Sequence, residues 1–196
     1  IIVVFSTFGE REARLIFDKI RLLRSELGDY IDRILISHRR SGNSEDETER
    51  KAREAWEGSE VLVCNECSVP DMGDEVGKGA DMRRAVYHVN NTAAKCGDPR
   101  ETVLVFLDAD VVTKYFGSHF VLALSGALLR GHDFARASFW RELGRIKKFV
   151  AQPLMSVIDH PDLKRITDFH YPLSAEAAGT LEFFNAVHFW QRYGVE

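Results

Sequence analysis

The chain has 196 residues, with 26 lysines and arginines against 30 aspartates and glutamates, and a formal net charge of -4. Its 45% hydrophobic and 29% charged residues are typical of a globular domain with a sizeable core. It has no basic stripe that would predict nucleic-acid binding, and its longest apolar runs, such as residues 103–107, are too short to cross a bilayer. The three cysteines are too few for a disulfide framework and favour a reducing cytoplasm.

The first half of the chain alternates short apolar runs with helical segments, which is typical of a mostly parallel sheet with helices on both faces. Residues 1–5 are continuously apolar and β-branched, as expected of a buried central strand. The next helix is indicated by apolar residues at helical spacing, namely Ile16, Ile20, Leu23 and Leu27. Gly28 suits the C-cap of this helix. Further strands are expected at residues 34–36 and 61–63.

The following elements are predicted from caps and loops. Ser44-Glu45-Asp46-Glu47 has the spacing of a capping box, which predicts a charged helix from there to about Trp56. A loop rich in acids and glycines leads to Gly77-Lys78-Gly79, where another helix begins. Residues 102–107 then give the strongest strand signal in the chain.

Beyond this strand the regular alternation stops. Residues 120–129 predict an apolar helix, and residues 134–140 alternate as in an antiparallel strand. Residues 145–158 form an amphipathic segment in which Pro153 is expected to introduce a kink.

The central chemical feature is Asp108-Ala109-Asp110, which follows the strongest strand directly. Side chains two apart on a strand point the same way, so both carboxylates are expected at its carboxyl end, where open α/β sheets bind ligands. Two like charges at close range favour a cation beside them, and oxygen ligands suit Mg²⁺ or Mn²⁺, whose other positions phosphates can fill. Asp108 and Asp110 therefore predict a metal site that holds a nucleoside diphosphate.

Two groups of positive charge could bind anions. Lys78 lies between two glycines at the start of a helix, where the helix N-terminus attracts anions. Arg145, Lys147 and Lys148 provide three charges within one turn, which could grip an acceptor that carries phosphate or carboxylate. The alternative for Lys78 is a loop lysine between two turn glycines. The alternative for the second group is solvated helix charge, which is the usual fate of such runs.

Other protein classes share parts of this pattern. A phosphatase of the D-x-D-x-T type needs a threonine at position 112, which is valine, and uses the first strand of its domain. A sugar nucleotidyltransferase should have a glycine-rich loop after the first strand, whereas residues 6–10 contain only Gly9. A non-catalytic domain that binds nucleotide sugars would fit the same residues and stays open as an alternative.

Together these residues resemble the retaining glycosyltransferases of GT-A fold, and among them the glucosyl-3-phosphoglycerate synthase family, with the mannosylglycerate synthases as second relatives. The resemblance is carried by Gly77-Lys78-Gly79, Leu107-Asp108-Ala109-Asp110, Gly144-Arg145-Ile146-Lys147 with Pro153-Leu154, Tyr171-Pro172-Leu173-Ser174-Ala175-Glu176 and Tyr193-Gly194-Val195-Glu196. It implies a Rossmann-like, mostly parallel sheet flanked by helices, with an antiparallel extension after the D-x-D strand. Residues 1–110 would be the nucleotide-sugar-binding half and residues 111–196 the acceptor-binding half of one domain that continues beyond residue 196.

The resemblance also implies roles for individual residues. The residues that would hold the donor are Ser6, Thr7, Glu10, Ser37, His38, Gly77, Lys78, Asp108 and Tyr193. Arg145 and Lys147 would bind the acceptor. Asp110 would ligate the metal together with Asp108. Glu196, beside the donor sugar or acceptor hydroxyl, would be catalytic along with Asp110.

The implied reaction moves a hexose from a nucleotide diphosphate sugar to 3-phosphoglycerate or glycerate, with UDP-glucose as the first choice of donor and GDP-mannose as the second. The resemblance further implies Mg²⁺ or Mn²⁺ as cofactor, a homodimer and no covalent nucleophile. Lys147 stands where the family has a hydroxyl residue that helps to bind the acceptor, and Ala175 stands where it has glycine. The family takes one more metal ligand, a histidine, from a region beyond the segment that ends at Glu196.

Overall fold

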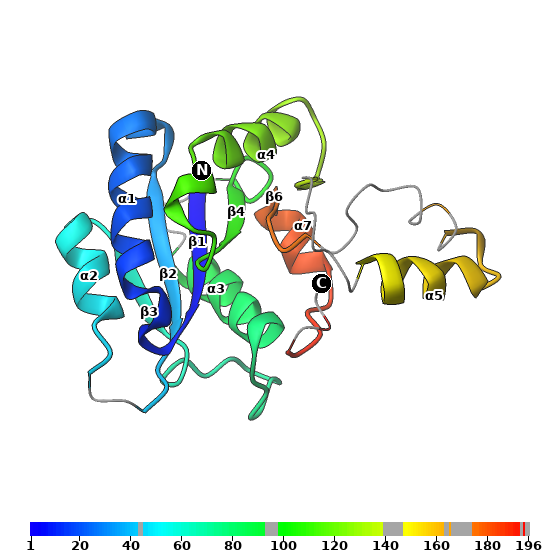
Figure 1. The fold of residues 1–196 in the computed structure, drawn as a ribbon, viewed down its shortest axis with the longest axis horizontal. Helices are drawn as coiled ribbons and strands as arrows, with labels where there is room; N and C mark the ends of the chain where they lie inside the picture. Colours follow the sequence, from blue (N-terminus) through cyan, green and yellow to red (C-terminus); the bar gives the residue numbers. More distant parts are fainter. Residues whose placement is uncertain are drawn as a thin grey trace.

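The computed structural model describes residues 1–42, 45–92, 98–138, 147–162, 165, 174–192 and 194, with the backbone alone for residues 10, 147 and 148. These residues form a six-stranded sheet with the strand order β3-β2-β1-β4-β6-β5 (Figure 1). The parallel strands are β1 (Ile2–Phe8), β2 (Arg33–Arg39), β3 (Glu60–Val63) and β4 (Val103–Asp108). The antiparallel extension consists of β6 (Ala177–Thr180), which pairs with β4, and β5 (Phe134–Arg136), which pairs with β6. The predicted α/β sheet with an antiparallel extension is confirmed.

Helices cover both faces of the sheet. One face carries α1 (Ala13–Leu27), α2 (Thr48–Ala55) and α4 (His119–Leu129), and the other carries α3 (Lys78–Thr92) and α7 (Leu181–Ala186). Short 3-10 turns are η1 (Gly9–Glu12), η2 (Gly28–Tyr30) and η4 (Thr113–Tyr115). A π-helical turn, η5 (Lys147–Ala151), leads into α5 (Gln152–Val157), which Figure 1 shows standing apart from the sheet. None of the helices in the described ranges has the length and apolarity needed to span a membrane.

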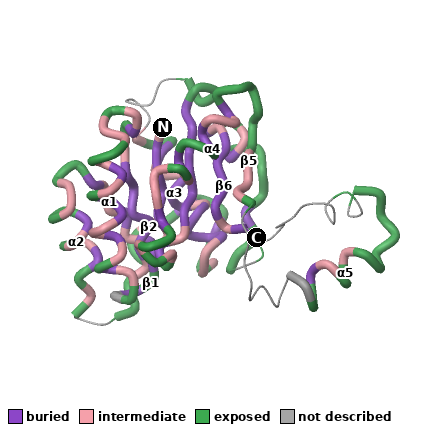
Figure 2. The backbone as a smooth tube through the Cα atoms, turned by 45° about the horizontal axis from the view of Figure 1, so that its top comes forward, coloured by how far each residue is buried: buried purple, intermediate pink, exposed green. Residues whose placement is uncertain are grey.

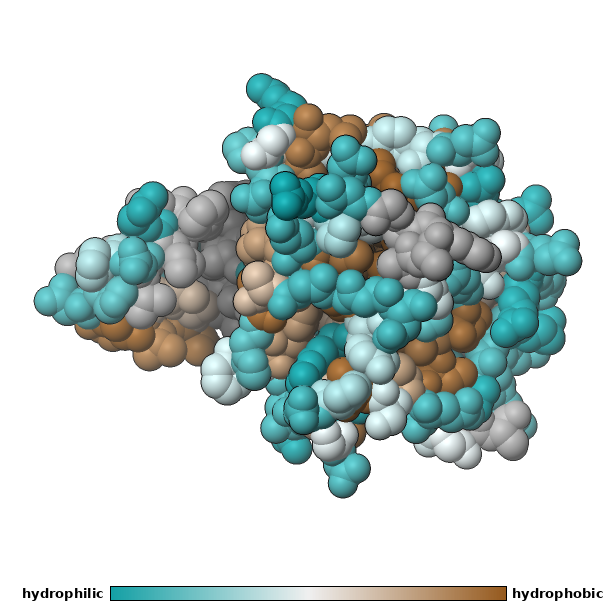
Figure 3. Space-filling view, turned by 180° about the vertical axis from the view of Figure 1, so that it is seen from behind, coloured by the Kyte–Doolittle hydropathy of each residue, from teal (hydrophilic) through white to brown (hydrophobic). Residues whose placement is uncertain are grey.

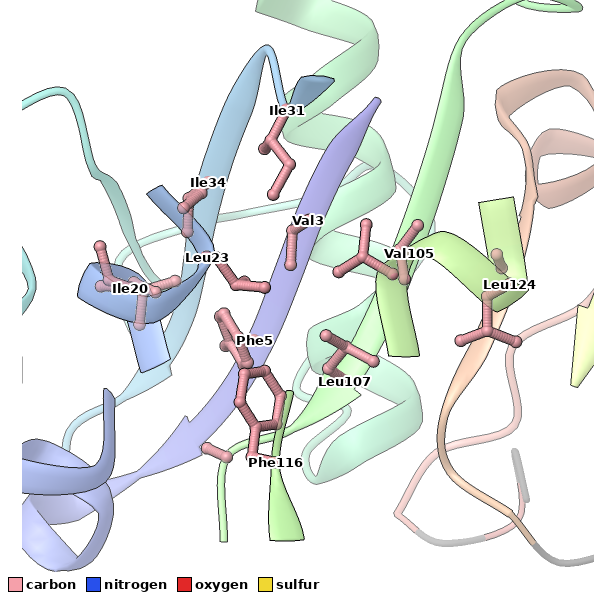
Figure 4. Close-up of a cluster of buried hydrophobic side chains, with 14 of the residues drawn as sticks. Val3, Phe5, Ile20, Leu23, Ile31, Ile34, Val105, Leu107, Phe116 and Leu124 are labelled. Atoms are coloured by element: carbon pink, nitrogen blue, oxygen red, sulfur yellow. The ribbon is translucent and has the colours of Figure 1, made fainter. Parts of the chain in front are cut away.

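Side chains of the central strands alternate between two apolar cores. On one face Val3 and Phe5 pack with Ile20 and Leu23 of α1, and Phe116 lies against Phe5 (Figure 4). On the other face the alternate residues of β1 pack against α3 and α7. Figure 2 shows the central strands as mostly buried, whereas the helices around them combine buried, intermediate and exposed residues. The continuous apolar run at the start of the chain is therefore a strand buried on both faces, as predicted.

One predicted helix boundary is confirmed and one is wrong. Gly28 caps α1 at φ 48°, and its N–H donates to the Arg24 carbonyl. By contrast, α2 begins at Thr48 rather than directly after Ser44, which lies outside the described residues. The Thr48 N–H is bonded to the Asp46 carboxylate at 3.0 Å, so Asp46 provides the nearby side-chain acceptor.

The second half of the chain also differs in part from the prediction. The apolar helix at residues 120–129 is confirmed as α4, whereas the strand expected over residues 134–140 is confirmed only as the short β5. Pro153 is the second residue of α5, which continues directly from η5. The helix geometry changes before Pro153, from π in η5 to α in α5.

An ion pair at the amino end of β3 generates a prediction about stability. Glu60 accepts two hydrogen bonds of 2.6 Å from Arg33 and lies 3.5 Å from His88. The Arg33 and His88 hydrogen bonds lower the pKa of the Glu60 carboxyl to about 2. A carboxyl group whose folded pKa is depressed stabilises the fold above its unfolded value of 4.5, and this contribution is lost as the pH falls toward 2.

We therefore expect Glu60→Gln to lower the Tm by about 2–4 °C at pH 7, a modest value because the carboxylate is partly solvated. The deficit relative to the unmodified chain should shrink as the pH is lowered from 4.5 toward 2. Glu54→Gln, which removes an exposed partner of Arg50 and Lys51 on α2, is the control and should change the Tm little. Thermal melts across this pH range make the comparison, and a deficit that stays constant with pH would contradict it.

Candidate functional site

Polar residues line the carboxyl ends of the three central strands. The hydrogen-bonded register places Ser6 of β1 between Ser37 of β2 and Asp108 of β4. One residue further along β1, Thr7 pairs with His38. Because ligands of open α/β sheets bind outside the carboxyl ends of the strands, these five predicted donor-binding residues lie where a ligand is expected.

Lys78 brings a positive charge to the same edge. It is the first residue of α3, and its Nζ lies 2.6 Å from Oδ1 of Asp108. The two side chains are 13% and 31% exposed, so a ligand can reach the pair from solvent. The positive end of the α3 dipole lies beside this ion pair, which adds to the preference for an anion.

The D-x-D turn is built differently from the way that strand alternation predicts. β4 ends at Asp108, so Ala109 and Asp110 belong to the turn that follows it. Ala109 is buried in the main core, whereas Asp110 is exposed. Both carboxylates nevertheless act on one group: burial lowers the pKa of the Lys19 ammonium to about 8, and Asp110 and Asp108 oppose that change. The two aspartates thus belong to one site, although alternation along a strand is not the reason.

Two more carboxyl groups reach this site, and neither was predicted to have a role there. Burial raises the pKa of Glu12, and the charge of Asp110 raises it further. Burial also raises the pKa of Glu176, which a 2.8 Å hydrogen bond from Ser174 opposes and the charge of Asp108 reinforces. The Tyr171 to Glu176 motif was a signal for the second group, because Glu176 is its last residue. The acidic cluster of the site consists of Glu12, Asp108, Asp110 and Glu176.

The donor set fits a hard divalent cation that shares its ligands with a substrate. Among the described residues, no group of three acidic, histidine or cysteine side chains is placed to hold a metal ion. An ion at Asp108 and Asp110 would therefore need phosphate and water oxygens to complete its coordination. Mg²⁺ and Mn²⁺ accept this arrangement, since Mg²⁺ sites commonly combine one or two carboxylates with substrate phosphates. A cation would also relieve the mutual repulsion that helps to raise the pKa values of Glu12 and Glu176.

His38 lies inside the protein and connects two segments of the site. Its Nδ1 is 2.8 Å from the Thr7 hydroxyl, and its Nε2 is 3.1 Å from the Asp46 carboxylate. Burial lowers the pKa of the ring, against the effect of Asp46, so we infer a neutral imidazole at pH 7. If the proton is on Nε2, this nitrogen points toward the Asp46 carboxylate as a donor, and Nδ1 can accept a hydrogen bond from the Thr7 hydroxyl. The ring itself is 0% exposed and orients Thr7 rather than facing solvent.

A buried ion network holds the loop that leads into α3. Arg39 of β2 donates a 2.9 Å hydrogen bond to Asp81, and Arg84 donates one of 3.2 Å to the same carboxylate. Arg84 also donates to the carbonyl groups of Cys67 and Glu75. Arg84 thus ties the loop before Lys78 to α3, and Asp81 ties α3 to β2. Cys67 and the buried Cys64 are free thiols, and nothing in the described residues makes their C-x-x-C spacing a metal site.

The last described segment of the chain packs against the start of α3. The Arg192 N–H donates to the Val76 carbonyl at 3.0 Å, and the Gly79 N–H donates to the Arg192 carbonyl at 2.9 Å. Gly77 adopts φ +91°, and a Cβ at this position would lie 2.6 Å from the Cα of Arg192. Gly77 is thus required both for its backbone conformation and for the close approach of the segment that precedes Tyr193.

This packing predicts a difference between two glycines of the same loop. Gly77→Ala should lower the Tm, and also the affinity for UDP if UDP is the donor nucleotide that the resemblance implies, because the new methyl group must displace the backbone at Arg192 in addition to straining the loop. Gly73→Ala is the matched control, since Gly73 also has a positive φ, +56°, but an added Cβ meets nothing within 4 Å. We expect Gly73→Ala to cost only about 1–2 kcal/mol of backbone strain and to leave UDP affinity unchanged. Thermal melts and calorimetry measure both effects, and equal losses in the two variants would contradict this explanation.

Several predicted site residues cannot be placed against this geometry. Tyr193, Arg145 and Glu196 lie outside the described residues, and the side chains of Glu10 and Lys147 are not described. Their roles stay predictions. The described residues bring together the donor-binding candidates at the carboxyl edge, the D-x-D aspartates and Lys78.

Comparisons with known proteins agree with this geometry. No protein-family model matches the chain. The chain is 29% identical over 201 residues to the glucosyl-3-phosphoglycerate synthase of Petrotoga mobilis, an alignment that covers 94% of this chain and 55% of that protein.

Solved structures are similar over almost the whole chain. The glucosyl-3-phosphoglycerate synthase of Mycobacterium tuberculosis, in complex with Mg²⁺ and UDP, has a TM-score of 0.75 and 26% identity over 99% of this chain and 60% of its own. The same enzyme with Mn²⁺, UDP-glucose and phosphoglyceric acid has a TM-score of 0.74 and 26% identity, with 99% and 61% covered. A further mycobacterial protein has a TM-score of 0.75 and 29% identity, with 99% and 57% covered.

The resemblance to the glucosyl-3-phosphoglycerate synthases is confirmed by these comparisons, and the fold is that of the GT-A glycosyltransferases. The chain spans little more than half of the length of the curated relative, which it covers to 55%.

Proposed function

We propose that this chain is the nucleotide-sugar-binding part of a metal-dependent glycosyltransferase, and that the whole protein moves glucose from UDP-glucose to 3-phosphoglycerate. The observation that carries the proposal is the row of Ser37, Ser6 and Asp108 across three strands, with the Lys78 ammonium on Asp108. Ser6, Asp108 and Lys78 offer hydroxyl, carboxylate and ammonium groups to one ligand, while Ser37 is buried beneath them. The complexes of the mycobacterial relative with UDP-glucose, Mn²⁺ and phosphoglyceric acid support the choice of donor and acceptor.

The donor would lie along the carboxyl edge of the sheet. Lys78 and the N-terminus of α3 would face the diphosphate, and Asp108 would hold the ribose or the metal. Ser6 and Thr7 would lie nearest to the nucleoside, while Ser37 supports them from within the protein, where its hydroxyl donates to the Asp81 carbonyl at 3.1 Å. His38 would act through Thr7. Glu10 and Gly77 complete the predicted donor contacts.

Asp110, with Asp108, would hold the Mg²⁺ or Mn²⁺ ion. When bound, the ion would neutralise negative charge on the diphosphate leaving group. Glu12 and Glu176 add two carboxyl groups beside these aspartates, and a cation at this position would stabilise their charged forms.

Acceptor binding, and the catalytic role that Glu196 would share with Asp110, are assigned to the part of the chain after residue 110. Arg145 and Lys147 would bind the acid and phosphate groups of the acceptor. Glu196 would lie beside the donor sugar or the acceptor hydroxyl. Arg192, which directly precedes Tyr193 in the sequence, is bonded to the loop that holds Lys78, and this supports a role for the terminal segment at the donor.

We further propose retention of the anomeric configuration by a front-face route. In this route the new bond to the acceptor oxygen forms on the face from which the diphosphate leaves. The leaving phosphate oxygen takes the proton of the acceptor hydroxyl. GDP-mannose as donor and glycerate as acceptor are the second choices at this site.

The surface of η5 and α5 supports a homodimer. Phe149, Leu154 and Val157 are 75%, 58% and 76% exposed, and Figure 3 shows apolar atoms gathered along one side of this projecting segment. Two such faces could bury each other in a dimer. The free thiols of Cys64 and Cys67 suit a cytoplasmic protein.

The metal assignment predicts the behaviour of one variant. Asp110→Asn should weaken UDP binding in the presence of Mn²⁺ by at least about tenfold, because loss of a metal-ligating charge removes much of the ion's affinity. UDP binding without metal should not weaken, since a negative charge near the diphosphate has been removed. Calorimetry with and without Mn²⁺ measures both. Asp29→Asn, at an exposed site in η2, removes the same charge elsewhere and should leave both affinities unchanged.

Unchanged Mn²⁺-dependent affinity in Asp110→Asn would overturn the metal assignment. The reaction itself is tested on the full-length protein by following UDP release from UDP-glucose with 3-phosphoglycerate. Pyrophosphate release from UTP and glucose 1-phosphate, without that transfer, would instead identify a nucleotidyltransferase.

A further inference from the structure

A lysine lies within the buried stripe of α1. The buried residues of this helix are Ala13, Ile16, Lys19, Ile20 and Leu23. Lys19 is 0% exposed, so its ammonium cannot touch a ligand in solvent. A buried charge is costly unless it is compensated, and an apolar side chain would fill this position without that cost. The lysine therefore needs an explanation beyond packing.

The ammonium of Lys19 lies directly behind the D-x-D turn. Its Nζ donates to the carbonyl oxygen of Ala109, the residue between Asp108 and Asp110. It also lies 5.2 Å from the centre of the Phe116 ring. Among the described residues, the Ala109 carbonyl is the hydrogen-bond acceptor of this ammonium, although a lysine can donate three such bonds. Its position is thus fixed by the turn that carries the metal-binding candidates.

The charge of Lys19 is balanced by the acidic cluster. Its pKa is lowered by burial to about 8 and held up by Asp110, Asp108, Glu12 and Glu176, so the ammonium is charged at pH 7. The cluster contains four carboxyl groups, and its cationic neighbours among the described residues include Lys19, Lys78 and, beside Glu12, Arg11. Lys78 is partly exposed and pairs with Asp108, so it can turn to a ligand, whereas Lys19 cannot.

We propose that Lys19 is the buried counter-charge of the acidic cluster, and that it makes the site prefer a cation already bound to a diphosphate over a free cation. A fixed positive charge behind the turn weakens the attraction of the carboxylates for a bare divalent ion. The same charge reduces their repulsion of a diphosphate. This inference rests on the proposed function, because it takes the cluster as the place where cation and diphosphate meet.

The test compares two uncharged variants at pH 7. Lys19→Met keeps the length of the side chain and removes both charge and donor, whereas Lys19→Gln removes the charge and keeps a donor for Ala109. In both variants Mn²⁺ alone should bind more tightly, and UDP without metal more weakly, on the order of threefold to tenfold each. Electron paramagnetic resonance of free Mn²⁺ and calorimetry with UDP measure the two affinities. Thermal melts show that each variant is folded.

Arg21→Met is the control for net charge, because Arg21 lies on the exposed side of the same helix and should leave both affinities unchanged. Tighter Mn²⁺ binding together with weaker UDP binding in both Lys19 variants would support the inference. Loss of a residue that only packs the core would not change these two affinities in opposite directions. Unchanged or weaker Mn²⁺ binding in Lys19→Met would overturn it. A Lys19→Gln variant that behaves like the unmodified chain would also overturn it, by assigning the effect to the hydrogen bond.

The outcomes separate this inference from the proposed function. If the unmodified chain binds UDP with Mn²⁺ but the Lys19 variants show no opposite changes, only the role of Lys19 is wrong. If the unmodified chain binds no UDP with or without Mn²⁺, the proposed function fails and the role of Lys19 fails with it.

Discussion

The pairing of β1 with β2 on one side and β4 on the other determines where the polar groups of the site lie. β1 is buried on both faces, so a shift by one residue would exchange its two sets of apolar side chains between the cores. The register that places Ser6 between Ser37 and Asp108 is thus held by packing on both sides of the sheet. A row of polar groups on rigid strands needs no reorganisation to meet a ligand, which favours tight and specific binding.

Several carboxyl groups are concentrated beside this row. Two lysines, one partly exposed and one buried, reduce the free-energy cost of placing these negative charges together. Lys78 compensates Asp108 at the surface and remains available to a ligand. Lys19 compensates the cluster from within and is fixed to the Ala109 carbonyl. Burial raises the pKa values of Glu12 and Glu176 and lowers that of Lys19, so burial disfavours the charged form of all three groups. Perturbed groups in one place are typical of functional sites rather than of ordinary surfaces.

The parallel half of the fold could be predicted because its strands are continuous apolar runs, and the D-x-D motif follows one of them at once. β6 could not, since residues 177–180 read Ala-Ala-Gly-Thr and become a strand only by pairing with β4 and β5. Lys19 was missed because helical patterns assign lysine to solvent. Its place, three residues after Ile16 and four before Leu23, nevertheless lies on the buried stripe. The partner that explains it, Ala109, lies 90 residues away and is brought there by packing alone.

The loop that holds Lys78 depends on a segment that lies much later in the chain. The backbone of Arg192 is bonded to Val76 and Gly79, on both sides of Lys78, and Gly77 leaves no room for a side chain between them. The conformation that presents Lys78 to Asp108 is therefore supported by residues that follow it by more than a hundred positions. Any change that loosens this contact should also loosen the Lys78–Asp108 pair, because a loop held by few contacts opens locally before the sheet does. Donor binding and the docking of the terminal segment are thus expected to stabilise each other.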